Sequence, residues 1–282
     1  MTLDPVISAR ELAALSDAIV MDCRPDPRAY AAGHVAGARH AQVERDLSAP
    51  TGDPSRGGRH PLPDIQVFAA TLGRWGIVPS SRVVAYDDQG GANAAARLWW
   101  MLRAVGHRDV QVVDGGFAAL REAGFALTTE EPAPATSPPY PCAAMTGAVA
   151  DIDEVESARS ATDRLVIDAR AAFRFRGDSD PFDPIAGHIP GARNAPYTDN
   201  LRPDGTFKSA DELHAQLTGV LDAIPADRTI VHCGSGVTAC HTLLAMERAG
   251  LRGAKLYVGS WSEWCRRPDR PREPRNGTRT SG

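Results

Sequence analysis

The sequence lacks any apolar run long enough to cross a membrane. Its 282 residues include no stretch close to the roughly 18 apolar residues that a membrane span needs. The first residues, Met1 to Val6, also lack the basic and apolar segments of a secretory signal peptide. We therefore expect a cytoplasmic protein with no membrane partner.

Paired cysteines and an excess of basic charge are lacking as well. The number of cysteines is odd and their spacings are irregular, which argues against a disulfide framework or a zinc site and for a reducing compartment. The formal net charge of −4 gives no reason to expect nucleic acid as a partner. We expect no metal and no cofactor. The five cysteines are Cys23, Cys142, Cys233, Cys240 and Cys265.

What the sequence does contain is an internal repeat. A short apolar run ends in Asp22-Cys23-Arg24, and a second one, 146 positions later, ends in Asp168-Ala169-Arg170. In each copy the pattern Gly-His-(Val/Ile)-x-Gly-Ala-Arg follows, at residues 33–39 and 187–193. The chain is therefore a tandem duplication. Because the histidine of this pattern occurs in both copies, we expect it to be structural rather than a metal ligand.

Short apolar strands alternate with helical stretches in each copy. This alternation is typical of an α/β fold in which a parallel sheet is covered by helices on both faces. We expect two such domains, at residues 1–128 and 146–266, joined by a proline-rich linker at residues 129–145. Residues 267–282 are rich in arginine and are predicted to be disordered.

Cys233 is the leading candidate for a nucleophile. It follows a predicted buried strand at residues 229–232 and precedes a helical pattern that starts at Val237. The intervening Gly234-Ser235-Gly236 permits a sharp turn, because glycine tolerates positive φ. A helix N-terminus favours a nearby anion by only about 0.3–1 kcal/mol, so the loop amides are also needed to stabilise a thiolate. The alternative is a buried cysteine with a structural role.

Two comparisons narrow the chemistry of this position. The first copy has Asp87 at the position that matches Cys233, so the first domain is predicted to be non-catalytic. A cysteine phosphatase needs an arginine after five intervening residues to bind the phosphate dianion. This chain has Ala239 there, which argues against phosphatase activity.

The segment Cys233-Gly-Ser-Gly-Val-Thr-Ala239 resembles the cysteine loop of the rhodanese-like sulfurtransferases, in their 3-mercaptopyruvate branch. Members of the thiosulfate branch usually have Cys-Arg-Lys-Gly-Val-Thr. The resemblance covers nearly the whole chain and implies two tandem rhodanese-like domains. It also implies that Cys233 takes sulfur from a small donor, forms a persulfide, and passes the sulfur to a thiol, a thioredoxin-type protein or cyanide.

The resemblance implies a role for the long polar loop at residues 46–63. In similar family members the matching loop reaches the catalytic domain. Its Asp and His, here Asp46 and His60, face the Ser of the cysteine loop, here Ser235. An ordinary solvated loop is the alternative.

The resemblance also implies an anion-binding arginine. Arg174, in an Arg-Phe-Arg-Gly motif, is expected to bind the donor's carboxylate through two parallel hydrogen bonds. Where the family usually has a second arginine, this chain has Phe182-Asp183. Arg176 is either a substitute for it or an ordinary solvated arginine. The chain also has Val258 where the family usually has Asp.

We expect 3-mercaptopyruvate to be preferred over thiosulfate as the donor. Thiosulfate is a dianion that would profit from positive charge in the loop, and Gly234 and Ser235 add none. A thiol donor instead needs a proton acceptor, which Ser235 and His60 would supply. A thiosulfate-preferring enzyme and a slow sulfur-carrier module are the alternatives. The predicted catalytic residues are Cys233, Ser235, His60 and Asp46, and the predicted substrate-binding residues are Arg174, Gly234, Ser235, Gly236, Val237 and Thr238.

Overall fold

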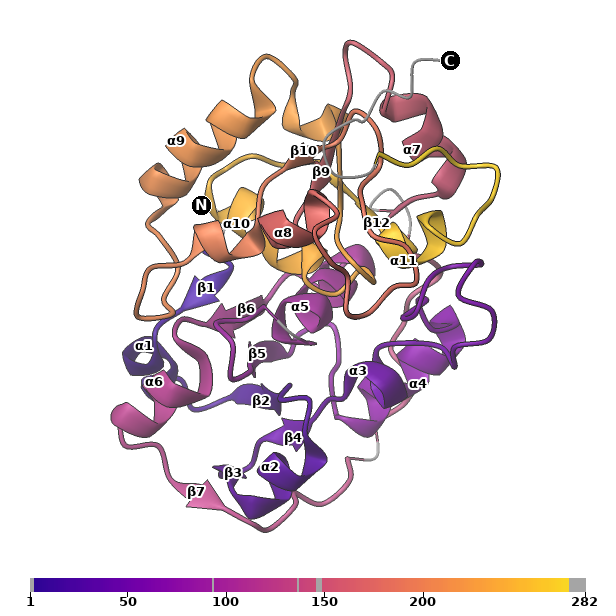
Figure 1. Cartoon of the computed structure of the whole chain (residues 1–282). Helices are drawn as coiled ribbons and strands as arrows, with labels where there is room; N and C mark the ends of the chain where they lie inside the picture. Colours follow the sequence, from indigo (N-terminus) through magenta and orange to yellow (C-terminus); the bar gives the residue numbers. More distant parts are fainter. Residues whose placement is uncertain (1–2, 93, 136, 146–148, 274–282) are drawn as a thin grey trace, which may run out of the picture.

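The computed structural model describes residues 3–92, 94–135, 137–145 and 149–273. It has two domains of the same design, one above the other in Figure 1. Each is built on a five-stranded sheet in which all neighbouring strands are parallel. The predicted α/β duplication is therefore confirmed.

The two sheets have matching strand orders. In spatial order, the first sheet consists of β1 (Val6–Ile7), β6 (Val110–Val113), β5 (Arg82–Tyr86), β2 (Ala18–Asp22) and β4 (Arg39–His40). The second consists of β8 (Val149–Ala150), β12 (Lys255–Tyr257), β11 (Thr229–His232), β9 (Leu165–Asp168) and β10 (Arg193–Asn194). A short antiparallel pair, β3 (His34–Val35) with β7 (Leu127–Thr128), extends the first domain.

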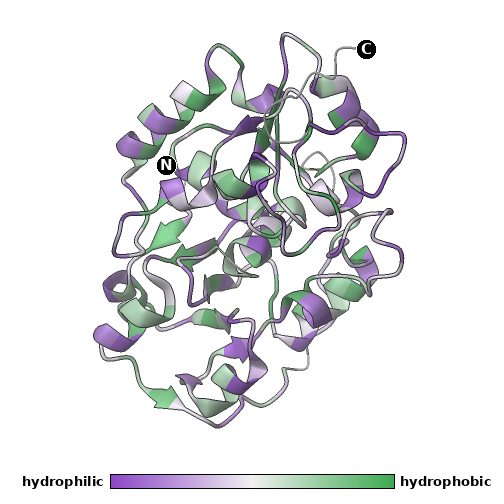
Figure 2. Cartoon of the chain, viewed as in Figure 1, coloured by the Kyte–Doolittle hydropathy of each residue, from purple (hydrophilic) through white to green (hydrophobic). Residues whose placement is uncertain are grey.

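Helices cover both sheets and separate them from solvent. In Figure 2 the outer helices, such as α9, carry both hydrophilic and hydrophobic residues, as amphipathic helices do. No described helix is both long enough and apolar enough to cross a bilayer. The helices are α1 (Ala9–Ala13), α2 (Pro27–Ala32), α3 (Val43–Asp46), α4 (Ile65–Arg74), α5 (Ala94–Ala104), α6 (Gly116–Glu122), α7 (Ile152–Ala158), α8 (Ala172–Phe175), α9 (Ala210–Leu221), α10 (Ala239–Arg248) and α11 (Ser260–Trp264), with short 3₁₀ turns η1 (Tyr197–Asn200) and η2 (Ala226–Arg228).

Helices α5 and α10 pack against each other where the two domains meet. Their buried residues, including Trp99, Trp100 and Leu243, belong to one apolar cluster that extends through both domains. Each of these helices starts just after the central strand of its own sheet, β5 or β11. The carboxyl ends of the two central strands therefore lie near the domain boundary, where a site can draw residues from both halves.

The linker and the tail are both held against the domains. The Ala135 amide donates to Arg74 O, and the Tyr140 amide donates to Ala69 O, so the linker runs along α4. Beyond residue 267 the expectation of disorder is wrong for the described part. Glu273 forms a backbone bridge with His188, and Trp264 Nε1 donates to Pro271 O over 2.7 Å. Residues 274–282 lie outside the described residues.

The repeated Gly-His pattern serves the backbone. His34 is fully buried, with Nδ1 at 3.0 Å from Tyr30 O and Nε2 at 3.2 Å from Glu130 O. His188 Nδ1 lies 2.8 Å from Phe175 O.

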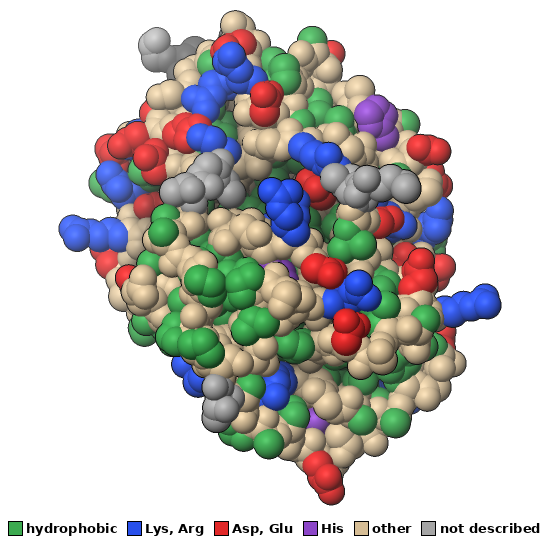
Figure 3. All heavy atoms as spheres, turned by 180° about the vertical axis from the view of Figure 1, so that it is seen from behind, with side chains coloured by type: hydrophobic (Ala, Val, Ile, Leu, Met, Phe, Trp, Pro, Cys, Tyr) green, Lys and Arg blue, Asp and Glu red, His purple; other side chains and the backbone are tan. Residues whose placement is uncertain are grey.

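The described residues contain no group of three or more His, Cys, Asp and Glu side chains arranged for a metal ion. On the face shown in Figure 3, acidic and basic side chains of the described residues are interspersed.

Candidate active site

The cysteine loop, residues 233–238, follows β11 as predicted. Cys233 is 1% exposed, and the Gly236 amide donates to its Sγ over 3.2 Å. Gly236 has φ of +76°, and a Cβ there would lie 2.5 Å from Val258 O. Glycine is therefore required at position 236 both by its backbone conformation and by the close approach of the Val258 carbonyl.

Helix α11 holds the loop from behind. The Cys233 amide donates to Ser260 Oγ over 3.2 Å, and the amides of Trp261 and Ser262 donate to Cys233 O and Gly234 O over 3.0 and 2.9 Å. Ser260 itself has φ of +54°, a conformation that few residues other than glycine adopt. These bonds fix the backbone on which Sγ is carried, so that the sulfur has a defined position.

Two guanidinium groups converge on Gly234. A Cβ at Gly234 would lie 3.0 Å from Arg174 Nη2 and 3.4 Å from Arg59 Nη2. Arg174 comes from α8 of the second domain, whereas Arg59 comes from the polar loop of the first domain. Arg174 therefore lies beside the cysteine loop, as expected, and Arg59 adds a second guanidinium that was not expected. The charge is absent from the loop sequence but is brought to it by tertiary packing.

Buried carboxylates orient these two arginines. Asp180 accepts from Arg174 Nε at 3.2 Å and Nη2 at 3.0 Å, and Asp183 forms an ion pair with Arg59. Neither aspartate side chain is exposed to solvent. Phe182 lies between them in sequence, and its ring centroid is 4.9 Å from Arg174 Cζ. The segment after Arg174 thus holds both guanidiniums in place beside the cysteine loop.

Arg176 does not take part in this arrangement. Its side chain is 53% exposed and pairs with Asp178 at 2.8 Å. Arg59, which sequence spacing did not suggest, is the second guanidinium beside Gly234. Its position next to His60 in the polar loop was the signal available in the sequence, because a loop expected to deliver His60 would also deliver its neighbour.

Ser235 and His60 meet across the domain boundary. Ser235 Oγ lies 2.9 Å from His60 Nδ1. Burial lowers the pKa of His60 to about 4, and the charge of Arg97 acts in the same direction. The imidazole is therefore neutral at neutral pH and is able to accept a proton. The predicted pairing of these two residues is present in the structure.

The structure does not bring Asp46 to His60. The Asp46 carboxylate accepts from the Gln42 amide over 2.9 Å and pairs with Arg45 at 2.7 Å, which fixes the end of α3. The carboxylate next to His60 is that of Glu44, whose Oε1 is 3.7 Å from His60 Nε2. The prediction that Asp46 and His60 together face Ser235 is therefore wrong for Asp46, because the Asp46 carboxylate is bonded within α3 and its N-cap instead.

These groups line one pocket of about 280 Å³ at the domain boundary. Most of the predicted substrate-binding residues are among its walls, together with apolar side chains that the sequence did not single out. Such a pocket, largely apolar with a few convergent polar groups, suits a small anionic ligand. Its lining includes Cys233, Gly234, Ser235, Val237, Thr238, Arg174, Arg59, His60, Glu44, Phe182, Pro25 and Val43.

A cysteine at the end of a central parallel strand, in a loop on which two guanidiniums converge, is an arrangement that suits a cysteine-dependent α/β enzyme. The chain matches the description of the rhodanese-like domain at residues 8–123 and again at residues 151–267. It belongs to the rhodanese-like family, as a tandem-domain sulfurtransferase.

Three relatives show the range of the family around this chain. A probable 3-mercaptopyruvate sulfurtransferase from Pseudomonas aeruginosa is 44% identical over 96% of this chain and 98% of its own length. A putative thiosulfate sulfurtransferase from Mycobacterium tuberculosis is 37% identical over 94% of this chain and 95% of its own length. The solved structure of 3-mercaptopyruvate sulfurtransferase from Leishmania major is 33% identical, covers 92% of this chain and 73% of that one, and superposes with a TM-score of 0.81.

Proposed function

We propose that this enzyme transfers sulfur from 3-mercaptopyruvate to a thiol, a thioredoxin-type protein or cyanide through a persulfide on Cys233. The observation that carries the choice of donor is the hydrogen bond of 2.9 Å between Ser235 and His60 beside Cys233. A thiol donor must lose a proton when its sulfur is transferred, whereas thiosulfate has none to lose. The names of the relatives include both donors, so the choice of donor has to be argued from the site.

The donor would bind with its carboxylate toward the guanidiniums of Arg174 and Arg59. Both lie within 3.4 Å of the Cβ position of Gly234, so an anion held there is next to the cysteine loop. A side chain at position 234 would occupy this space. Charge-assisted hydrogen bonds from arginine are stronger than neutral ones and match the two oxygens of a carboxylate. The thiol end of the donor then points to Cys233.

The first half-reaction balances within the site. The thiolate of Cys233 attacks the donor sulfur, an S–S bond forms, and the C–S bond of the donor breaks. The bonding electrons leave as the enolate of pyruvate. Ser235 and neutral His60 accept the thiol proton and return a proton to the enolate carbon. Pyruvate leaves, and the persulfide stays on Cys233 next to the Gly236 amide.

In the second half-reaction a thiolate or cyanide attacks the outer sulfur of the persulfide. The S–S bond breaks, and Cys233 returns as a thiolate. Two covalent half-reactions predict ping-pong kinetics. Residues 234–238 are proposed to bind the transferred sulfur through their backbone, of which the Gly236 amide is seen in contact with Sγ.

A second candidate donor is thiosulfate. The specific observation in its favour is the pair of guanidiniums near Gly234, since two positive charges suit a dianion. The two donors are separated by measuring kcat/KM for each, with cyanide as acceptor, in the wild type and in Ser235→Ala. We expect wild type to favour 3-mercaptopyruvate, and Ser235→Ala to lower that value about 10²-fold while changing the thiosulfate value little. Equal losses for both donors would refute the proton-transfer role.

A further inference from the structure

Arg97 is a fully buried arginine of the first domain that reaches the cysteine loop of the second. It lies in α5 and is 0% exposed. Its Nη1 donates to Gly236 O over 2.9 Å, and its Nη2 donates to Leu47 O over 3.1 Å and to His60 O over 2.9 Å. One side chain therefore ties α5, the polar loop and the cysteine loop together.

The positive charge of Arg97 has no carboxylate partner among the described residues. A buried cation without an opposite charge is costly, and proteins usually provide one. The other guanidiniums around the cysteine loop follow that rule, since each pairs with a buried aspartate. Those pairs are Arg170 with Asp168 at 2.6 Å, Arg174 with Asp180 at 3.0 Å, and Arg59 with Asp183.

The ionisable groups that act on Arg97 with a negative sign are two sulfurs, while the neighbouring His60 is neutral. Burial lowers the pKa of Arg97, while the sulfurs of Cys240 and Cys233 act to raise it. Burial raises the pKa of Cys240 to about 12, so Cys240 is a neutral thiol at neutral pH, and its Sγ donates to Gly236 O over 3.4 Å. Tyr197, a further titratable group near Cys233, is kept neutral because burial raises its pKa. Of the two sulfurs, that of Cys233 accepts a hydrogen bond from the Gly236 amide over 3.2 Å, and Gly236 is the residue that Arg97 holds through its carbonyl.

We propose that Arg97 is a positioning residue for sulfur transfer, which balances the anionic sulfur of Cys233 from the other domain and fixes Gly236, whose amide donates to that sulfur. This proposal rests on the proposed function in taking Cys233 as the sulfur carrier. It gives the domain without a nucleophile a definite part in the chemistry. A guanidinium next to a cysteine favours the thiolate over the thiol, and the same charge favours the persulfide anion.

The test measures the anionic form of Cys233 directly, without sulfur transfer. Iodoacetamide alkylation of the Cys233 peptide is followed by mass spectrometry from pH 5 to pH 10 in the full chain. In Arg97→Gln we expect the midpoint of the alkylation rate to move up by about one pH unit, which lowers the rate below the midpoint about tenfold. Arg97→Lys keeps the charge, so its midpoint should stay near that of the wild type while its kcat falls, because the bonds to three carbonyls are not reproduced.

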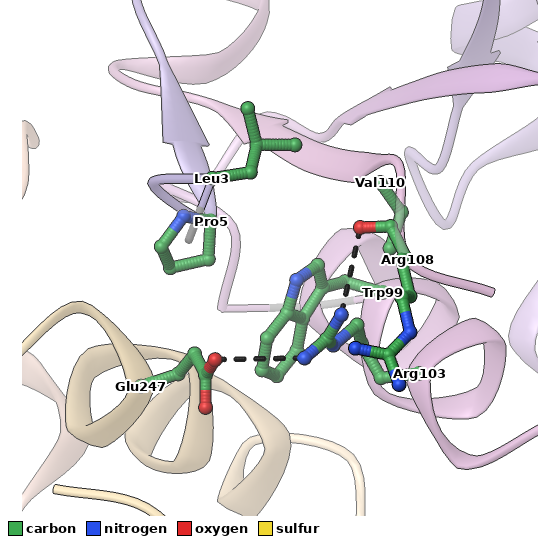
Figure 4. Close-up of a pocket in the computed structure, with 7 residues that line it drawn as sticks. All are labelled: Leu3, Pro5, Trp99, Arg103, Arg108, Val110 and Glu247. Atoms are coloured by element: carbon green, nitrogen blue, oxygen red, sulfur yellow. Dashed lines mark hydrogen bonds and ion pairs between the residues drawn. The ribbon is translucent and has the colours of Figure 1, made fainter. Parts of the chain in front are cut away.

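Arg103→Gln is the matched control. Arg103 lies on the same helix and pairs across the boundary with Glu247 of α10 at 3.5 Å, in a hollow away from Cys233 (Figure 4). The Arg103→Gln variant should leave the alkylation midpoint of Cys233 unchanged. A folded Arg97→Gln with the midpoint of the wild type would overturn the proposal. If Arg97→Gln does not fold, a folded Arg97→Lys with a midpoint raised by about one unit would overturn it. A midpoint that rises in Arg97→Gln, in an enzyme whose Cys233 takes up no sulfur from either donor, would instead count against the proposed function alone.

Discussion

The two domains carry matching loops after matching central strands, with Asp87 in the first loop and Cys233 in the second. In the first domain the Asp87 carboxylate accepts from the amides of Gln89 and Gly91 over 2.9 and 2.8 Å, and from the Ala95 amide over 3.4 Å. In the second, the Gly236 amide donates to the Cys233 sulfur. Both loops thus direct backbone amides at the side chain that follows the strand, an arrangement that suits a negative group. The loop is common to both domains, and they differ in the residue at its first position, which is Asp87 or Cys233.

The Asp-x-Arg motifs show what the second domain has added. Arg24 Nη2 donates to Asp22 over 2.6 Å and to Gly33 O over 2.8 Å, and Arg170 makes the same two bonds to Asp168 and Gly187 O. Arg170 Nη1 also lies 3.2 Å from Asp180.

Asp180, Phe182 and Asp183 lie in the stretch between Arg170 and His188, which is longer than its counterpart in the first domain. The proposed anion site is therefore built largely by this longer stretch and by the polar loop of the first domain, which contacts the second domain. The two domains share one fold and differ mainly in two loops, the stretch between Arg170 and His188 and the polar loop at residues 46–63.

Replacing Cys233 should have the largest effect on sulfur transfer, because it removes the main difference between the two loops. Cys233→Asp gives the second loop the anion of the first, and Cys233→Ser removes the nucleophile at nearly constant size. We expect both variants to fold and to lose sulfur transfer by at least about 10³-fold, because no other group replaces a lost nucleophile. Steady-state assays with both donors measure the loss, and thermal unfolding reports whether each variant is folded. Activity within tenfold of the wild type in either variant would refute Cys233 as the nucleophile.

Removing either guanidinium near Gly234 tests the anion site. Arg59→Ala and Arg174→Ala are each expected to lower kcat/KM for 3-mercaptopyruvate about 10- to 100-fold, mainly through KM, since a charged hydrogen bond contributes about 1.5–3 kcal/mol. Mercaptoacetone, a donor without the carboxylate, should be much less affected. Arg176→Ala is the control and should change neither value, because that side chain is exposed and paired with Asp178. A loss that is equal for both donors would indicate a structural role instead.

The pH profile tests the neutral state of His60. Its pKa of about 4 predicts that kcat/KM for 3-mercaptopyruvate falls as pH drops through about 4, because protonated His60 no longer accepts a proton. The unfolded chain binds this proton near pH 6.5, so the contribution of His60 to stability is full above that pH and is lost as pH falls toward 4. His60→Gln should remove this acidic limb. A limb with a midpoint near 6.5 in the wild type would contradict a buried, neutral His60.

The smallest expected effect is a shift in the pH profile that distinguishes Glu44 from Asp46 as the carboxylate acting on His60. Glu44 raises the pKa of His60, against the effect of burial, so Glu44→Gln should shift the acidic limb to lower pH by less than about one unit. Asp46→Asn should leave the limb in place and lower the melting temperature, because Asp46 bonds the Gln42 amide at the end of α3. The two pH profiles, recorded side by side, show which carboxylate acts on His60. A shift in Asp46→Asn alone would reverse the assignment.

The residues that are local in sequence could be predicted. The strand before Cys233, the turn of Gly234-Ser235-Gly236 and the duplication follow from short-range pattern and spacing, and β11 ends at His232 as expected. Ser235 and His60 could be paired only through family resemblance, because 175 positions separate them.

The groups that sequence reasoning missed arrive by tertiary packing. Arg59, Arg97 and Glu44 have no periodicity or motif of their own. Arg59 and Arg97 reach the cysteine loop because the first domain docks on the second, whereas Glu44 lies near His60 through the fold of the first domain itself. Arg176 was named because it is near Arg174 in sequence, but the short helix α8 sends it to solvent. Nearness along the chain was a poor guide to charge at this site, since buried aspartates select which arginines face the loop.

The measurement that tests the account most directly is the mass of the Cys233 peptide after the enzyme meets 3-mercaptopyruvate without an acceptor. We predict the addition of one sulfur atom to Cys233, an equal amount of pyruvate released, and loss of the added sulfur as thiocyanate when cyanide is supplied. Turnover with no added sulfur on Cys233, or with the sulfur on Cys240 or another cysteine, would contradict it.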